Sequence, residues 1–133
     1  MAQHLYTFDD PPSQKHLERA CRLLGQDGVI AYQTDLNWAI GCNAASPRAV
    51  DRIKQLKPHH PKDRPFSLLC SSISMVAEFA VVDNYQYRML KKAWPGPYTV
   101  ILQSHKTLVR QLKDKRRVVG VRVPDSPMLI ALL

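Results

Sequence analysis

The sequence lacks long apolar runs and the targeting signals that would place a protein in or across a membrane. No stretch reaches the ~18 uncharged apolar residues of a membrane-spanning helix, and no basic start followed by an apolar core opens the chain. We therefore expect no signal peptide, no membrane partner and a cytoplasmic location. Internal repeats, low-complexity segments and linkers are also absent, so the 133 residues predict one domain, 1–133.

Cysteines are few, and no two of them are closely spaced. Cys21, Cys42 and Cys70 form no C-x-x-C pair, which argues against both a disulfide framework and a zinc knuckle. Cys21 lies on the apolar face of an expected helix and Cys70 ends an apolar strand, so we expect buried, inert thiols. The five histidines have no metal-ligand spacing, and we expect no metal site formed by the protein alone.

The common phosphate-binding and metalloprotease motifs are missing as well. Neither G-x-x-x-x-G-K-[ST], G-x-G-x-x-G nor H-E-x-x-H occurs. Positive charge is abundant instead, since 19 Lys and Arg residues against 11 Asp and Glu residues give a net charge of +8. Such a balance favours contact with polyanions such as RNA or nucleotides, without deciding between them.

Apolar spacing predicts helices that alternate with strands, and the expected helix caps are Ser13, Ser46, Asp83 or Asn84, and Ser126. We expect helices over 13–28, 46–58, 72–80, 83–94 and 124–133, and strands over 29–32, 65–70, 98–102 and 118–123. Helical turns are expected at 107–112 and a charged loop at 113–117. This order predicts the α/β class, with an open, twisted, mixed sheet and flanking helices. The last helix, rich in apolar residues, either docks onto the sheet or belongs to an incomplete domain.

Three groups of residues could form a site beyond the ends of the strands. Thr34-Asp35 interrupts the first strand, several basic residues lie at 57–64, and the rigid turn 94–97 leads into another strand. In α/β sheets ligands bind at strand ends, and basic side chains there neutralise phosphate. We favour a ligand site at Thr34-Asp35 over an ordinary turn. A simple turn and a solvated basic loop remain the alternatives.

Four ordered segments carry a resemblance to a known family: GVIAYQTDLNWAIGC, AVDRIKQLKP with KDRPFSLLC, WPGPYTVIL, and VVGVRVPDSP. Together they resemble the YrdC/YciO family, the YciO branch most closely, from about residue 14 to 133. The resemblance implies a YrdC-like fold with a concave basic face. Family domains continue beyond the matched segments, so it also implies a domain truncated at its C-terminal end.

The activity implied by the resemblance is that of the L-threonylcarbamoyladenylate synthases. These enzymes convert ATP, bicarbonate and L-threonine into threonylcarbamoyl-AMP for tRNA modification. ATP would be a substrate, accompanied by Mg²⁺, and the family is a nucleotidyltransferase family. We expect the chain alone to be weak or inactive as an enzyme.

The resemblance also implies roles for individual residues. Thr34 and Arg122 would bind the substrate threonine. Nucleotide binding would fall to Lys57, Arg64, Ser67 and Thr99. Independently of the resemblance, the basic residues could form a face that binds tRNA or double-stranded RNA, with Lys54, Lys62, Lys113, Lys115, Arg116 and Arg117 as its expected contacts. No residue is assigned to catalysis.

Four positions depart from the family pattern. Gln33 replaces a proline, Leu36 a small hydroxyl residue and Trp38 a tyrosine, while His59 stands where an arginine is expected after Lys57. A mostly neutral histidine neutralises phosphate less than an arginine does. Two other readings therefore stay open: a non-catalytic RNA-binding module, and an inactive remnant that forms a homodimer through an open sheet edge.

Overall fold

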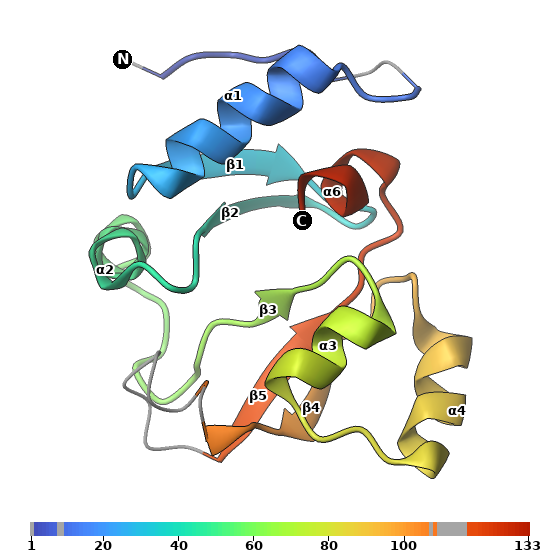
Figure 1. Ribbon diagram of the computed structural model, residues 1–133. Coiled ribbons are helices and arrows are strands. Elements are labelled where there is room, and N and C mark those ends of the chain that lie inside the picture. Colours follow the sequence, from blue (N-terminus) through green and yellow to red (C-terminus); the bar gives the residue numbers. More distant parts are fainter. Residues whose placement is uncertain (1, 8–9, 107, 109–116) are drawn as a thin grey trace.

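The computed structural model describes residues 2–7, 10–106, 108 and 117–133 (Figure 1). Its helices are α1 (Gln14–Gly25), α2 (Pro47–Leu56), α3 (Ile73–Phe79), α4 (Asn84–Ala93) and α6 (Pro127–Leu132). Its strands are β1 (Val29–Gln33), β2 (Trp38–Cys42), β3 (Leu68–Leu69), β4 (Val100–Gln103) and β5 (Val118–Arg122). The α/β class is confirmed. The helical turns expected at 107–112 and the loop at 113–117 lie almost wholly outside the described residues.

The described strands form two separate groups. β1 and β2 make an antiparallel hairpin, whose register runs from Val29 opposite Cys42 to Gln33 opposite Trp38. The second group has the order β3-β5-β4, with β5 parallel to β3 and antiparallel to β4. This confirms a mixed sheet. β2 is absent from the predicted strands, because no tight-turn signal separates it from β1 in the sequence.

Local capping chemistry explains where most helices begin. The hydroxyls of Ser46 and Ser126 accept backbone N–H groups in the first turns of α2 and α6, as the sequence predicts. At α4, Asp83 and Gln86 form a capping box with two reciprocal hydrogen bonds. The predicted cap at Ser13 is wrong for its side chain, which caps nothing. Only its carbonyl accepts hydrogen bonds from the first turn of α1.

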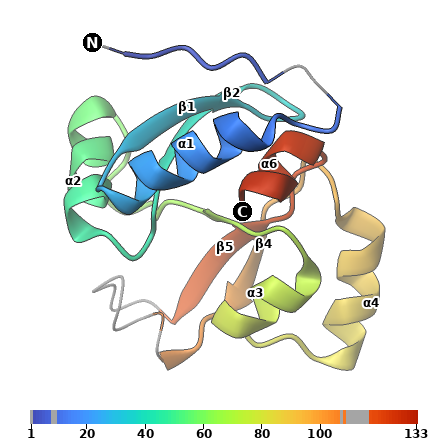
Figure 2. The same cartoon turned by 45° about the horizontal axis from the view of Figure 1, so that its top comes forward.

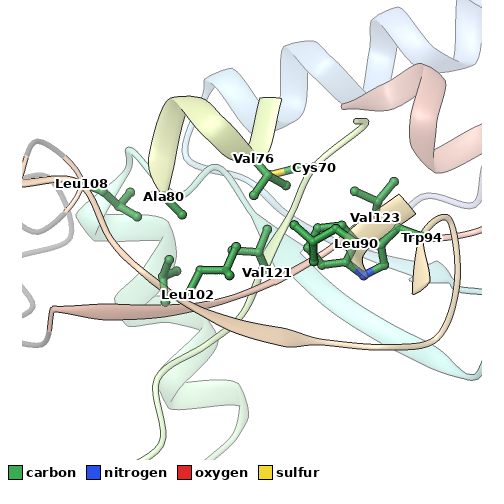
Figure 3. Close-up of a cluster of buried hydrophobic side chains, with 10 residues drawn as sticks. Cys70, Val76, Ala80, Leu90, Trp94, Leu102, Leu108, Val121 and Val123 are labelled. Carbon is green, nitrogen blue, oxygen red and sulfur yellow. The ribbon is translucent and has the colours of Figure 1, made fainter. Parts of the chain in front are cut away.

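The main hydrophobic core lies between α3, α4 and one face of the three-stranded sheet (Figure 3). Val76 comes from α3, Leu90 from α4, and Leu102 and Val121 from the sheet. Because side chains alternate along a strand, the inward position of Val121 sends its neighbour Arg122 to the opposite face. The core therefore fixes which face of β5 carries polar groups.

A second layer places α1 and α6 beside the hairpin (Figure 2). In α6, Leu129 is only 1% exposed and Ile130 packs against the main core, so this helix docks onto the fold as it stands. Cys21 on α1 is exposed, which makes its predicted burial wrong, whereas Cys70 is buried as expected. Over the described ranges, no helix is long and apolar enough to cross a membrane.

Candidate functional site

The Thr34-Asp35 segment forms the turn of the β1–β2 hairpin. The Thr34 hydroxyl donates to the Asn37 carbonyl at 2.8 Å and accepts the backbone N–H groups of Leu36 and Asn37, each at 3.1 Å. The Thr34 N–H also donates to the Asn37 carbonyl. Thr34 is therefore buried and bonded within its own turn. The turn and ligand-site readings are compatible, because this rigid loop fixes the direction of Asp35.

Arg122 ends β5 and joins the hairpin to the sheet. Its Nη2 donates to Oδ1 of Asp35, and its Nε donates to the Gly96 carbonyl at 3.0 Å. The side chains of Arg122 and Asp35 are 11% and 14% exposed. The result is a nearly buried ion pair between groups 87 residues apart in the chain. Sequence periodicity left open whether Arg122 points inward or outward; the structure turns it toward the hairpin.

Gly96 is the third member of this cluster. Its N–H donates to the Val123 carbonyl at 2.9 Å, and its own carbonyl accepts from Arg122 Nε. Two hydrogen bonds therefore join the 94–97 turn to the end of β5. A Cβ at Gly96 would lie 2.7 Å from the Ala93 carbonyl oxygen. The turn therefore needs glycine here, and it supplies a fixed acceptor for the guanidinium.

Ser67 and Thr99 meet over Gly120, on the same face of the sheet as Arg122. A Cβ placed on Gly120 would lie 3.1 Å from Ser67 Oγ and 3.2 Å from Thr99 Cγ2. Ile101 pairs with Gly120 on this face and is 71% exposed. The structure thus brings Ser67, Thr99 and Arg122 together on an accessible surface.

Tyr32 and Cys42 extend the cluster on the hairpin. A Cβ on Gly41 would lie 2.8 Å from the Tyr32 hydroxyl, so the tyrosine ring lies directly over that glycine. Burial raises the pKa of Tyr32, the Cys42 thiol raises it further, and the nearby Arg122 guanidinium lowers it. Burial also raises the pKa of Cys42. Both groups are therefore protonated near pH 7, and a neutral phenol lies near the ion pair.

Lys57 and Arg64 both lie on the loop between α2 and β3. Lys57 is exposed at the C-terminal end of α2, as the sequence predicts. Within the loop, His60 Nε2 donates to the Arg64 carbonyl at 2.8 Å and its ring stacks on Phe66 with 4.5 Å between centroids. His60 therefore organises the loop, while His59 is exposed. In the described part of the chain, the carboxylate that pairs with Arg122 is that of Asp35, and neither Lys57 nor Arg64 forms an ion pair with it.

The residues predicted to bind RNA are only partly covered by the structure. Lys113, Lys115 and Arg116 lie outside the described residues. Lys54 is exposed and pairs with Asp51 at 3.1 Å, and both Lys62 and Arg117 are exposed. A different element, α4, carries a basic surface that the prediction omitted: Arg88, Lys91 and Lys92 lie beside the exposed Tyr85 and Tyr87.

Sequence reasoning missed the partners that hold Arg122. Thr34-Asp35 was singled out because polar residues interrupt an apolar strand, but nothing in the sequence indicated the Asp35–Arg122 contact or the Gly96 acceptor. Tyr32 could have been noted from its position two residues before Thr34, on the same face of the strand. Where the structure describes the chain, no three His, Cys, Asp or Glu side chains gather in a way that could hold a metal ion.

Comparison with known proteins gives consistent results at the levels of family, sequence and structure. The family model for Sua5, YciO and YrdC domains, described as telomere recombination, matches residues 22–133. The Escherichia coli K12 protein YciO is 36% identical over the whole chain, which spans 65% of that relative. The threonylcarbamoyl-AMP synthase of Psychromonas ingrahamii is 33% identical over 87% of the chain and 62% of that relative.

Two solved structures have the same arrangement of elements. The crystal structure of E. coli YciO has a TM-score of 0.83 at 36% identity, covering 92% of this chain and 59% of that one. The crystal structure of P. abyssi Sua5 complexed with L-threonine has a TM-score of 0.79 at 25% identity, covering 91% of this chain and 36% of that one. The chain therefore spans less than two thirds of the length of these relatives.

Proposed function

Because the chain belongs to the Sua5/YciO/YrdC family, we propose that it binds L-threonine and ATP as a threonylcarbamoyl-AMP synthase-type domain. The single observation that carries this proposal is the nearly buried Arg122, held at a strand end beside Asp35 with donors to spare. A guanidinium in such a position suits a carboxylate or a phosphate. The P. abyssi Sua5 structure was obtained with L-threonine, which supports an amino-acid ligand for this fold.

The proposed reaction joins three substrates. The amine of L-threonine takes up the carbon of bicarbonate, and the resulting carbamate oxygen attacks the α-phosphorus of ATP, releasing diphosphate; one water leaves overall. In this chain Arg122 would hold the threonine carboxylate, and Thr34 would act through the turn that its hydroxyl stabilises. Ser67 and Thr99 would line the nucleotide side, and Lys57 and Arg64 would contact its phosphates, with Mg²⁺ entering bound to ATP.

Binding is the first property to test, because the chain spans 65% of its curated relatives. Calorimetry with MgATP should give micromolar binding that tightens when L-threonine and bicarbonate are added. Lys57→Ala should weaken MgATP binding about tenfold, the usual loss for one charge-assisted phosphate contact. Lys92→Ala, which removes an exposed lysine from α4, is the matched control and should change nothing. Absence of heat with either ligand would refute the proposal.

A second candidate function, RNA binding, is favoured by α4. This helix carries three basic residues, exposes Tyr85 and Tyr87, and contains no acidic residue. Lys91 Nζ lies 5.7 Å from the centre of the Tyr87 ring. Basic side chains interleaved with aromatic rings suit single-stranded or looped RNA.

RNA binding predicts a steep dependence on salt. The affinity for tRNA should fall as salt rises, and Arg88→Ala should reduce the slope of log K against log salt by about one if Arg88 contacts a phosphate. Lys54→Ala tests the predicted α2 surface in the same assay. An affinity independent of salt would rule out this second function.

A further inference from the structure

The loop between α2 and β3 contains two consecutive turns. In the first, the His60 N–H donates to the Lys57 carbonyl at 3.0 Å. In the second, the Arg64 N–H donates to the Pro61 carbonyl, also at 3.0 Å. Each bond joins the first and fourth residues of its turn, as in a β-turn. Lys57 therefore begins the first turn and Arg64 ends the second, and both residues are exposed.

The His60 side chain joins the two turns to each other. Its Nε2 donates to the Arg64 carbonyl at 2.8 Å. Its ring stacks on Phe66, with 4.5 Å between the ring centroids and 23° between the ring planes. His60 is thus bonded to Lys57 through its main chain and to Arg64 through its side chain, while Phe66 orients the imidazole. The relative position of the two cationic residues therefore depends on this one histidine.

We propose that His60 is a positioning residue for the nucleotide phosphates. It holds the main chain at Lys57 and at Arg64 in one arrangement, so that two positive charges are presented together to one polyphosphate chain. This inference rests on the proposed binding of MgATP. Cations on a loop that is ordered in advance lose less conformational entropy on binding than cations on a loose loop, which increases affinity. A ligand without phosphate gains nothing from this arrangement.

Variants of the two adjacent histidines test the proposal by calorimetry. His60→Leu removes the donor to the Arg64 carbonyl and should weaken MgATP binding about fivefold, while the affinity for L-threonine, which has no phosphate, should not change. His60→Gln keeps an N–H donor on a side chain of similar reach and should restore MgATP binding to within about twofold of the wild type. His59→Leu is the matched control, since His59 is exposed, and should change neither affinity.

A double-mutant cycle with Arg64→Ala shows whether His60 acts through the arginine. Once the guanidinium is gone, the position of the Arg64 main chain matters less to the nucleotide. His60→Leu should then weaken MgATP binding by less than about twofold in the Arg64→Ala background. Phe66→Leu, which keeps the imidazole but removes the ring on which it stacks, should weaken MgATP binding about threefold and provides the same test if His60→Leu does not fold.

The outcomes distinguish this inference from the proposed function. If the wild-type chain binds MgATP and His60→Leu binds it equally well, the positioning role is wrong while the proposed function stands. A parallel fall in the affinities for MgATP and L-threonine would overturn the inference too, because His60 would then support the fold in general. Equal losses from His60→Leu with and without Arg64 would show that the histidine does not act through the arginine. If the wild-type chain binds neither ligand, both proposals fail.

Discussion

Removal of the Arg122 guanidinium should destabilise the fold more than any comparable change on its surface. Arg122→Met keeps the aliphatic bulk but abolishes the hydrogen bonds to Asp35 and to the Gly96 carbonyl. It leaves the Asp35 carboxylate, only 14% exposed, without its cation. Removing one partner of a buried ion pair lowers the free energy of unfolding by ~3–5 kcal/mol. Because water still reaches part of Asp35, we expect a loss near the lower end of this range, about 3 kcal/mol.

A double-mutant cycle separates this pair from general loss of packing. Asp35→Leu alone should also destabilise, since it leaves the arginine unpaired, but Asp35→Leu with Arg122→Met removes both charges together. The double variant should therefore lose about 2 kcal/mol less than the sum of the single variants. Asp35→Asn, which keeps an acceptor for Nη2, should lose less than about 1 kcal/mol.

Urea unfolding at pH 7, followed by far-ultraviolet circular dichroism and by tryptophan fluorescence, measures these differences. Coincident curves from the two probes would justify a two-state analysis. A loss below about 1 kcal/mol for Arg122→Met, or strict additivity in the cycle, would refute the view that this pair holds the hairpin to the sheet.

Three further predictions follow from burial and capping. Burial, aided by the Glu78 carboxylate, raises the pKa of Cys70 to about 11. A thiol in the unfolded chain has a pKa of ~8.5, so between these two pH values only the native state keeps the Cys70 proton. The free energy of unfolding should therefore fall as pH rises through this window, by on the order of 3 kcal/mol, and Cys70→Ala should reduce the fall in urea titrations. Under native conditions iodoacetamide should label the exposed Cys21 well before the buried Cys70, as read by mass spectrometry; equal rates would contradict the structure. Asp83→Ala removes the capping box of α4 and should cost about 1 kcal/mol in the same unfolding assay, and no change would show that the box contributes nothing.

The sequence predicts the starts of most helices because these depend on hydrogen bonds between residues close together in the chain. Ser46 followed by Pro47 marked the start of α2, and Asp83 marked α4, because a side-chain oxygen in these places satisfies otherwise unpaired N–H groups. Ser13 has the same kind of side chain but makes no such bond. Whether a hydroxyl turns toward a helix depends on the path of the preceding chain, which composition alone does not fix.

Tertiary arrangement accounts for the predictions that were wrong or incomplete. The spacing of Leu17 and Cys21 correctly predicted a helix, but which edge of its apolar face is covered depends on its neighbours, and Cys21 remains exposed. β2 was missed because the four residues from Thr34 to Asn37 make a turn with side-chain bonds, without the Asn-Gly or Asp-Gly signal of a tight hairpin. The Asp35–Arg122 contact spans 87 residues, beyond the reach of any local pattern.

The position of this contact links ligand binding to the cohesion of the fold. In the described ranges the β1–β2 hairpin shares no strand pairing with the β3-β5-β4 sheet. Two features connect these layers across the end of β5: α6, which continues from that strand and packs beside α1, and the Asp35–Arg122 pair. A ligand bound to Arg122 beside this turn would therefore add a further contact between the same layers and stabilise the folded state by mass action. Because the same side chains hold the layers together, a loss of binding in an Arg122 variant is interpretable only beside its unfolding free energy, whereas Asp35→Asn changes charge with little change in cohesion.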